Sequence, residues 1–102
     1  MSYFAVTRAA GPGWTTGKGA FEQPGVEDHM AFMGSLAADG FVRCAGPVAG
    51  TEQDLIRVLL IVEAGDAAEV RHRFDPDPWS TSGHLEVTSV EAWNVLVGAD
   101  RL

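Results

Sequence analysis

One segment, Leu55 to Glu63, constrains the fold of this chain more than any other, because it predicts a strand that is apolar on both faces. Side chains alternate between the two faces of a strand. One face carries Ile56, Val58, Leu60 and Val62, and the other carries Leu55, Leu59 and Ile61. Helices of the same chain can cover one face of a sheet, so something else must cover the second. A second copy of the sheet is the simplest cover, which predicts a homodimer or higher homo-oligomer.

Three other segments have the alternation and the β-favouring residues of strands. Tyr3 to Arg8 is stopped by glycine and proline. Phe41 to Val48 is joined to the two-sided strand by a turn-rich stretch, which predicts a hairpin. His84 to Val97 predicts a long last strand, and its alternation slips near Ser89, where we expect a β-bulge.

Two segments predict helices. Between Pro24 and Asp39, apolar side chains and one histidine recur at helical spacing. This stripe consists of Val26, His29, Met30, Met33, Leu36 and Ala37. A second helix of about nine residues follows a capping box formed by Asp66 and Glu69, and it ends before Pro76.

The resulting order, β-α-β-β-α-β, is the split βαβ or ferredoxin-like arrangement of the α+β class. It predicts a four-stranded antiparallel sheet with two helices on one face. Two such sheets facing each other form a dimeric α+β barrel, which the two-sided strand favours. Because 102 residues is the length of one domain, we expect residues 1–102 to form a single domain.

A glycine- and threonine-rich loop, about residues 10–23, interrupts this pattern after the first strand. It carries an isolated Trp14, and connections of this length are usually functional or mobile. Two interpretations are open. The loop is a lid over a site, or it is a disordered surface loop whose tryptophan is incidental.

The net charge argues against one class of partner. A formal charge of −7 and an isoelectric point near 4.7 exclude the basic footprint that nucleic-acid binding requires. The electrostatic field of this net negative charge repels anionic small molecules, so an acidic substrate would need a local cationic contact. The arginines available for such a contact are Arg8, Arg43, Arg57 and Arg71.

Three features predict a soluble cytoplasmic protein. The longest apolar run, Val58 to Val62, is far short of the ~20 residues that cross a bilayer. The N-terminal residues lack the basic stretch and apolar region of a signal peptide. Cys44 is the single cysteine and cannot form an internal disulfide, which fits a reducing compartment, and we expect a packed thiol there.

Proton chemistry is predicted at two distant residues, if the fold brings them together. His29 lies on the apolar face of the first helix, and Asp77 belongs to an Asp-Pro-Trp turn. An imidazole can take or give a proton near neutral pH, and a carboxylate on its far nitrogen fixes its tautomer. In the alternative interpretation, His29 is a core residue bonded to a backbone carbonyl, and Asp77 only caps the turn before Pro78.

Aromatic residues near these positions are candidates for a substrate pocket. Phe32, Phe41 and Trp79, and also Trp93, could line a cleft between sheet and helix, although ordinary core packing explains them equally well. Trp79 is favoured for the pocket because it adjoins Asp77.

Cofactor and metal motifs are incomplete. Residues 12–19 lack the first glycine and the final Ser or Thr of a phosphate-binding loop. The pairs His84 with Glu86 and His72 with Asp75 fall short of a recognised ligand set, so we interpret them as surface residues. We therefore expect neither a cofactor nor a metal.

Several short motifs, taken in order, resemble the YCII-related (YciI-like) family over most of the chain. They are His29-Met30-Ala31-Phe32-Met33 with Leu36 and Gly40, then Ala45-Gly46-Pro47, Asp77-Pro78-Trp79, Gly83 and Trp93. The resemblance implies a dimeric ferredoxin-like α+β barrel with an active site at His29 and Asp77. A related branch includes chloromuconolactone dehalogenases, which implies proton transfer on a lactone.

We therefore expect a homodimeric small-molecule enzyme in which His29 is the general acid or base and Asp77 orients it. Isomerisation, elimination or hydrolysis of a lactone-like compound all fit this dyad. Two alternatives stay open. One is a non-catalytic ligand-binding or assembly module that uses the same barrel cleft, and the other is a cofactor-free oxygenase.

Overall fold

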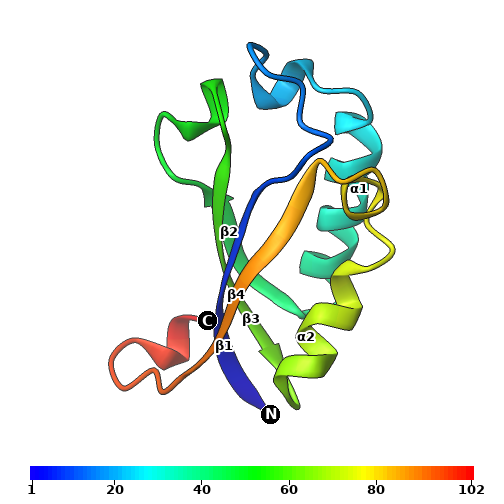
Figure 1. Cartoon of the computed structure of the whole chain (residues 1–102). Helices are drawn as coiled ribbons and strands as arrows, with labels where there is room; N and C mark the ends of the chain where they lie inside the picture. The colour runs from blue at the N-terminus through cyan, green and yellow to red at the C-terminus, as the bar shows by residue number, and fades with distance from the viewer.

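The chain folds into an antiparallel sheet that carries two longer helices on one face, as the computed structural model of residues 1–102 shows (Figure 1). The strands are β1 (Ser2–Ala10), β2 (Val42–Pro47), β3 (Arg57–Ala64) and β4 (Leu85–Trp93). The helices are α1 (Val26–Ala38), α2 (Ala67–Phe74) and α3 (Pro78–Thr81), and short 3₁₀ turns are η1 (Ala20–Glu22), η2 (Thr51–Gln53) and η3 (Ala99–Arg101). The strand order is β2-β3-β1-β4, and every pairing is antiparallel. The predicted ferredoxin-like α+β fold is confirmed.

The main core lies between the two longer helices and the inner face of the sheet. Alternation along β1 and β3 turns one set of side chains toward the helices. The buried members are Phe4, Val6, Leu60 and Val62 from the strands and Leu36, Val70 and Phe74 from the helices. Because α3 follows α2 closely and contacts α1, this packing places the Asp-Pro turn beside the first helix.

The helix boundaries follow local sequence signals closely. The first helix begins two residues after Pro24, because Gly25 adopts the left-handed conformation with φ of 78°. Asp66 caps α2 as predicted, and its side chain accepts a hydrogen bond from the backbone N–H of Glu69 at 2.8 Å. The Glu69 carboxylate accepts from the N–H of Gly65. None of the helices has the length and apolar composition that crossing a bilayer requires.

The last strand differs from its prediction in length and in the position of its bulge. It ends at Trp93, four residues early. Arg8 pairs with Val87 while the residue before Arg8 pairs with Ser89, so Thr88 is the extra residue of the bulge. The bulge therefore falls one residue before the predicted position and directly beside Arg8.

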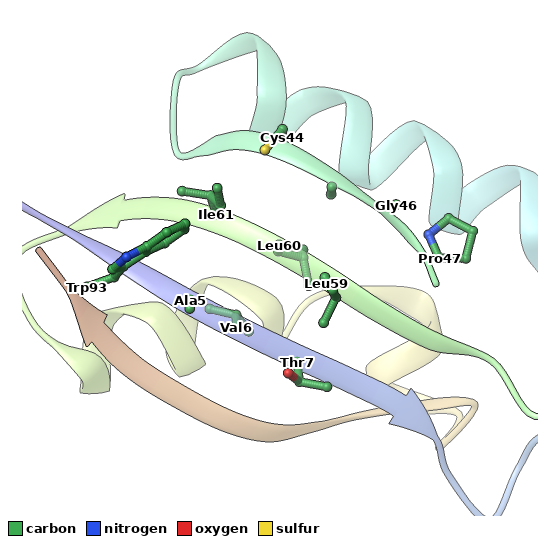
Figure 2. Close-up of a pocket in the computed structure, with 11 residues that line it drawn as sticks. Ala5, Val6, Thr7, Cys44, Gly46, Pro47, Leu59, Leu60, Ile61 and Trp93 are labelled. Carbon is green, nitrogen blue, oxygen red and sulfur yellow. The ribbon is translucent and has the colours of Figure 1, made fainter. Parts of the chain in front are cut away.

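The other face of the sheet is apolar and uncovered in the single chain (Figure 2). Leu59 is 55% exposed and Trp93 is 44% exposed. They line an open hollow of about 500 Å³ together with Ile61 and parts of β1 and β2. Cys44 also lines this hollow and is exposed, so the prediction of a packed thiol is wrong for the single chain.

Candidate active site

Asp77 lies at the start of a one-turn helix, α3, where the sequence predicts only a turn. Pro76 follows the end of α2, and Pro78 occupies the first position of α3, where the missing N–H of proline breaks no helical bond. The Asp77 Oδ1 accepts a hydrogen bond from the backbone N–H of Trp79 at 2.9 Å. The Asp77 side chain is completely buried, whereas that of Asp75 is exposed.

His29 reaches this carboxylate from the inner face of α1. Its Nδ1 lies 2.9 Å from each carboxylate oxygen of Asp77. The structure thus brings together the two residues that the sequence singled out, although 48 positions separate them. The imidazole is bonded to the carboxylate instead of a backbone carbonyl. Asp77 performs the capping role of the alternative interpretation at the same time.

Arg8 is the third member of this buried cluster, and the sequence analysis did not assign it to the site. Its guanidinium donates to Asp77 Oδ2 at 2.8 Å and to the hydroxyl of Ser80 at 2.8 Å. The Ser80 hydroxyl in turn donates to the carbonyl of Phe74. Arg8 is only 1% exposed. The alternation of Phe4, Val6 and Arg8 could have revealed it, because an arginine in phase with buried residues needs a carboxylate partner.

The hydrogen bonds of the cluster decide its protonation. Burial opposes a charged carboxyl, but bonds from His29, Arg8 and the N–H of Trp79 together hold the pKa of Asp77 below its ordinary value. Burial lowers the pKa of Arg8, and its bond to Asp77 opposes this effect. An ionised carboxylate can only accept hydrogen bonds, so Nδ1 of His29 carries the proton. In the neutral ring, Nε2 is therefore the nitrogen with a free lone pair.

Trp79 fixes the plane of the His29 ring. The two rings stack with centroids 4.1 Å apart and planes within 11°. The indole N–H of Trp79 donates to the carbonyl of Pro24 at 2.8 Å, which ties α3 to the start of α1. Trp14 packs edge-on against Trp79 and donates to the carbonyl of Asp54. Because Trp14 is buried, the interpretation of its loop as disordered with an incidental tryptophan is wrong.

The two histidine pairs that the sequence analysis placed on the surface have different environments. His72 lies 3.4 Å from Asp75 and both are exposed. His84, in contrast, is buried, stacks against Trp79 and shares a hydrogen bond of 2.6 Å with the hydroxyl of Ser82. The surface interpretation of His84 is therefore wrong. No group of three or more His, Cys, Asp or Glu lies close enough to hold a metal ion.

A cavity of about 220 Å³ is lined by the His29 side chain. Its wall is mostly apolar and comes from α1, β2, β3 and the loop before α1. The lining residues are Ala20, Phe21, Val26, His29, Met30, Met33, Ala45, Gly46, Pro47, Glu52, Ile56, Val58 and Trp79. Because Nδ1 of His29 faces Asp77, Nε2 is the ring nitrogen available to a molecule in this cavity.

Among the predicted pocket residues, the structure places only Trp79 on this cavity. Phe41 is buried in the main core, edge-on to Phe74, and Phe32 packs against the same core. Met30 and Met33 line the cavity instead. Met30 follows His29 directly, and Met33 lies about one helical turn after it. Trp93, the fourth aromatic candidate, lies on the opposite face of the sheet (Figure 2).

Comparison with known proteins assigns the chain to a family. The YCII-related domain matches residues 7–94, which include Arg8, His29 and Asp77. The chain belongs to the YCII-related family, as its motifs predicted. This YCII-related chain is similar to the solved structure of 5-chloro-2-hydroxyhydroquinone dehydrochlorinase (TftG) from Burkholderia phenoliruptrix AC1100, in complex with 2,5-dihydroxybenzoquinone. Identity is 28%, the TM-score is 0.67, and the match covers 90% of this chain and 93% of TftG. No curated protein matches it.

Proposed function

We propose that this YCII-related protein catalyses an elimination on a small ring compound, with His29 as the general base and Asp77 as its orienting partner. The observation that carries the proposal is the orientation of His29. Its Nδ1 is held by a buried carboxylate, and its Nε2 is free beside an apolar cavity. The similarity to a dehydrochlorinase supports elimination over isomerisation or hydrolysis of a lactone.

In this mechanism, Nε2 of His29 accepts a proton from the bound substrate. A hydroxylated aromatic ring reacts as its keto tautomer, in which the carbon that bears chlorine also bears hydrogen. The electrons of the broken O–H bond then form a carbonyl double bond, a ring double bond shifts, and chloride leaves with its bonding pair, so the substrate loses one HCl and becomes a quinone. Asp77 stabilises the imidazolium that forms and keeps the ring in one tautomer. The imidazolium then returns its proton to water, which restores the neutral ring.

The size and polarity of the cavity suit this class of substrate. An apolar protein cavity of about 150 Å³ is known to hold benzene. The cavity beside His29, at about 220 Å³, has room for a ring that carries substituents. Its mostly apolar wall suits the faces of a ring compound.

We also propose that the chain works as a homodimer in which two sheets face each other. The uncovered apolar face that contains Leu59, Ile61 and Trp93 supports this assembly. Large exposed apolar patches usually mark interaction sites. The cavity beside His29 lies toward the helix-covered side of the sheet, and Ala45, Gly46 and Pro47 of β2 line both this cavity and the hollow.

The test is chloride release from 5-chloro-2-hydroxyhydroquinone by the purified chain, compared with His29→Asn. The variant should lose about 10²- to 10⁴-fold in rate, the usual contribution of a general base, while it still binds the substrate. His84→Asn is the matched control, because His84 is also buried against Trp79 but does not line the cavity.

Two outcomes would contradict the proposal. If His29→Asn released chloride as fast as the native chain, His29 would not be the base. If the native chain bound hydroxylated rings but released no chloride, and opened no lactone, the non-catalytic binding module would be the better account.

A further inference from the structure

A second polar group, Glu52, stands in the wall of the cavity beside His29. Its Oε2 is buried and has no hydrogen-bond partner within the chain. The only other lining side chains with nitrogen or oxygen atoms are His29 and Trp79, and the Trp79 N–H is already bonded to the carbonyl of Pro24. Two polar groups of the cavity wall therefore lack a partner within the chain, His29 Nε2 and Glu52 Oε2, and a ligand contacts the second when the Glu52 side chain turns toward the cavity.

The turn that carries Glu52 is firmly placed. The Thr51 hydroxyl donates to the carbonyl of Val48 and accepts from the N–H of Arg57, which fixes η2 against the start of β3. The loop before α1 packs closely on this turn, since a Cβ added to Gly19 would lie only 3.1 Å from the carbonyl oxygen of Glu52. These contacts fix the backbone of the turn beside the cavity and leave the Glu52 side chain free to change its rotamer.

An unpartnered carboxylate oxygen in an apolar wall calls for a hydrogen-bond donor. Buried polar atoms in proteins nearly always have a partner, and leaving one unsatisfied is costly. No lysine or arginine lines the cavity to supply one. Arg8 is bonded to Asp77, and Arg43 is paired with Glu63 at 2.6 Å on the surface. A ligand that donates a hydroxyl proton satisfies Glu52, whereas a ligand that presents only an anionic group is repelled by it.

We propose that Glu52 is a binding residue that selects ring compounds bearing a hydroxyl group. The inference deepens the proposed function and rests on it, because it assigns the substrate class of the same cavity. Glu52 accepts a hydrogen bond from a ring hydroxyl, while the apolar wall packs against the ring itself. Hydroxylated rings are preferred to the same rings with their hydroxyls methylated.

The test compares the binding of hydroquinone and of 1,4-dimethoxybenzene to the full chain by titration calorimetry. The native chain should bind hydroquinone more tightly. Glu52→Leu should weaken hydroquinone binding on the order of 10- to 100-fold, the usual effect of losing a hydrogen bond to a charged group, and leave dimethoxybenzene binding unchanged. Glu52→Gln keeps a neutral acceptor and should show a smaller loss.

Glu22→Gln is the matched control, because it removes the same charge from an exposed position outside the cavity wall. It should preserve the preference for hydroquinone. The inference is overturned if the native chain shows no preference, or if Glu52→Leu weakens both ligands equally. The two proposals fail separately, since chloride release by His29→Asn tests the base, and the hydroquinone preference of Glu52→Leu tests Glu52.

Discussion

Arg8 and Asp77 form a completely buried ion pair at 2.8 Å, although they lie 69 positions apart in the sequence. Arg8 sits on the central strand β1, and Asp77 caps α3. Burial opposes a charged carboxyl, but bonds from His29, from Arg8 and from the N–H of Trp79 together hold the pKa of Asp77 below its ordinary value. An ionised carboxylate accepts hydrogen bonds only, so the proton of His29 sits on Nδ1. The arginine therefore acts on the proposed chemistry without lining the cavity.

Arg8→Met should destabilise the fold by about 3–5 kcal/mol, because it leaves the buried charge of Asp77 without its cation. Urea unfolding measures this loss. Ser80→Ala removes the hydrogen bonds of the Ser80 hydroxyl with Arg8 and with the carbonyl of Phe74, and it should cost less, about 1–3 kcal/mol. A free energy of unfolding for Arg8→Met within 1 kcal/mol of the native value, about the effect of one ordinary hydrogen bond, would show that Arg8 is not needed to hold the carboxylate.

The stabilisation that Asp77 provides should depend on pH in a defined direction. Its pKa is lower in the folded chain than in the unfolded chain, so the unfolded chain binds more protons between the two values. The contribution of Asp77 to the free energy of unfolding is complete above the ordinary aspartate pKa of about 3.9. It is lost as the pH falls through the pKa that Asp77 has in the folded chain. The difference in unfolding free energy between the native chain and Asp77→Asn should therefore narrow below about pH 4. A difference that stays constant down to acid pH would contradict this account.

Gln23 should control the affinity of the cavity for its ligand. Its side chain accepts from the N–H of Thr15 and donates to the carbonyls of Thr15 and Lys18, which orders the loop that supplies Ala20 and Phe21 to the wall. Gln23→Ala should raise KM for elimination more than it lowers kcat. Gln53→Ala, at an exposed position, is the control and should change neither constant. A loss in kcat alone would mean that the loop acts on the chemistry.

Leu59→Glu should convert the proposed dimer into a monomer, because it buries a charge at the centre of the apolar face. Sedimentation at micromolar concentration measures the change. Leu96→Glu places the same charge at another exposed leucine outside the hollow and should leave the dimer intact. A native chain that sediments as a stable monomer would leave the apolar face without an explanation.

The fold was predictable because its signals are local and regular. Strand alternation, helical spacing and the Asp66 cap each depend on a few neighbouring residues, and together they yield the observed element order. The positions that were missed depend on contacts between distant segments. The bulge at Thr88 depends on pairing with β1, and the short helix after Asp77 is bonded to Arg8 of β1 and to the carbonyl of Pro24 before α1.

The site was predictable only in part, for the same physical reason. His29 and Asp77 carry chemistry that is visible in the sequence, and the motifs of the family join them. Phe41 was assigned to the pocket from residue type alone, whereas its ring turns toward Phe74 and the core. The proposed role of Glu52 depends on the packing of the loop before α1 against its turn, which no spacing along the chain reveals.

The measurement that tests the account most directly is the tautomer of His29, read from long-range ¹H–¹⁵N correlations of the ring. In its neutral form, the ring should be protonated at Nδ1 and bonded to Asp77, and the signal of the unprotonated Nε2 should shift when a hydroxylated ring enters the cavity. A ring protonated at Nε2, or an Nε2 signal that no ligand perturbs, would contradict the role of His29 as the base.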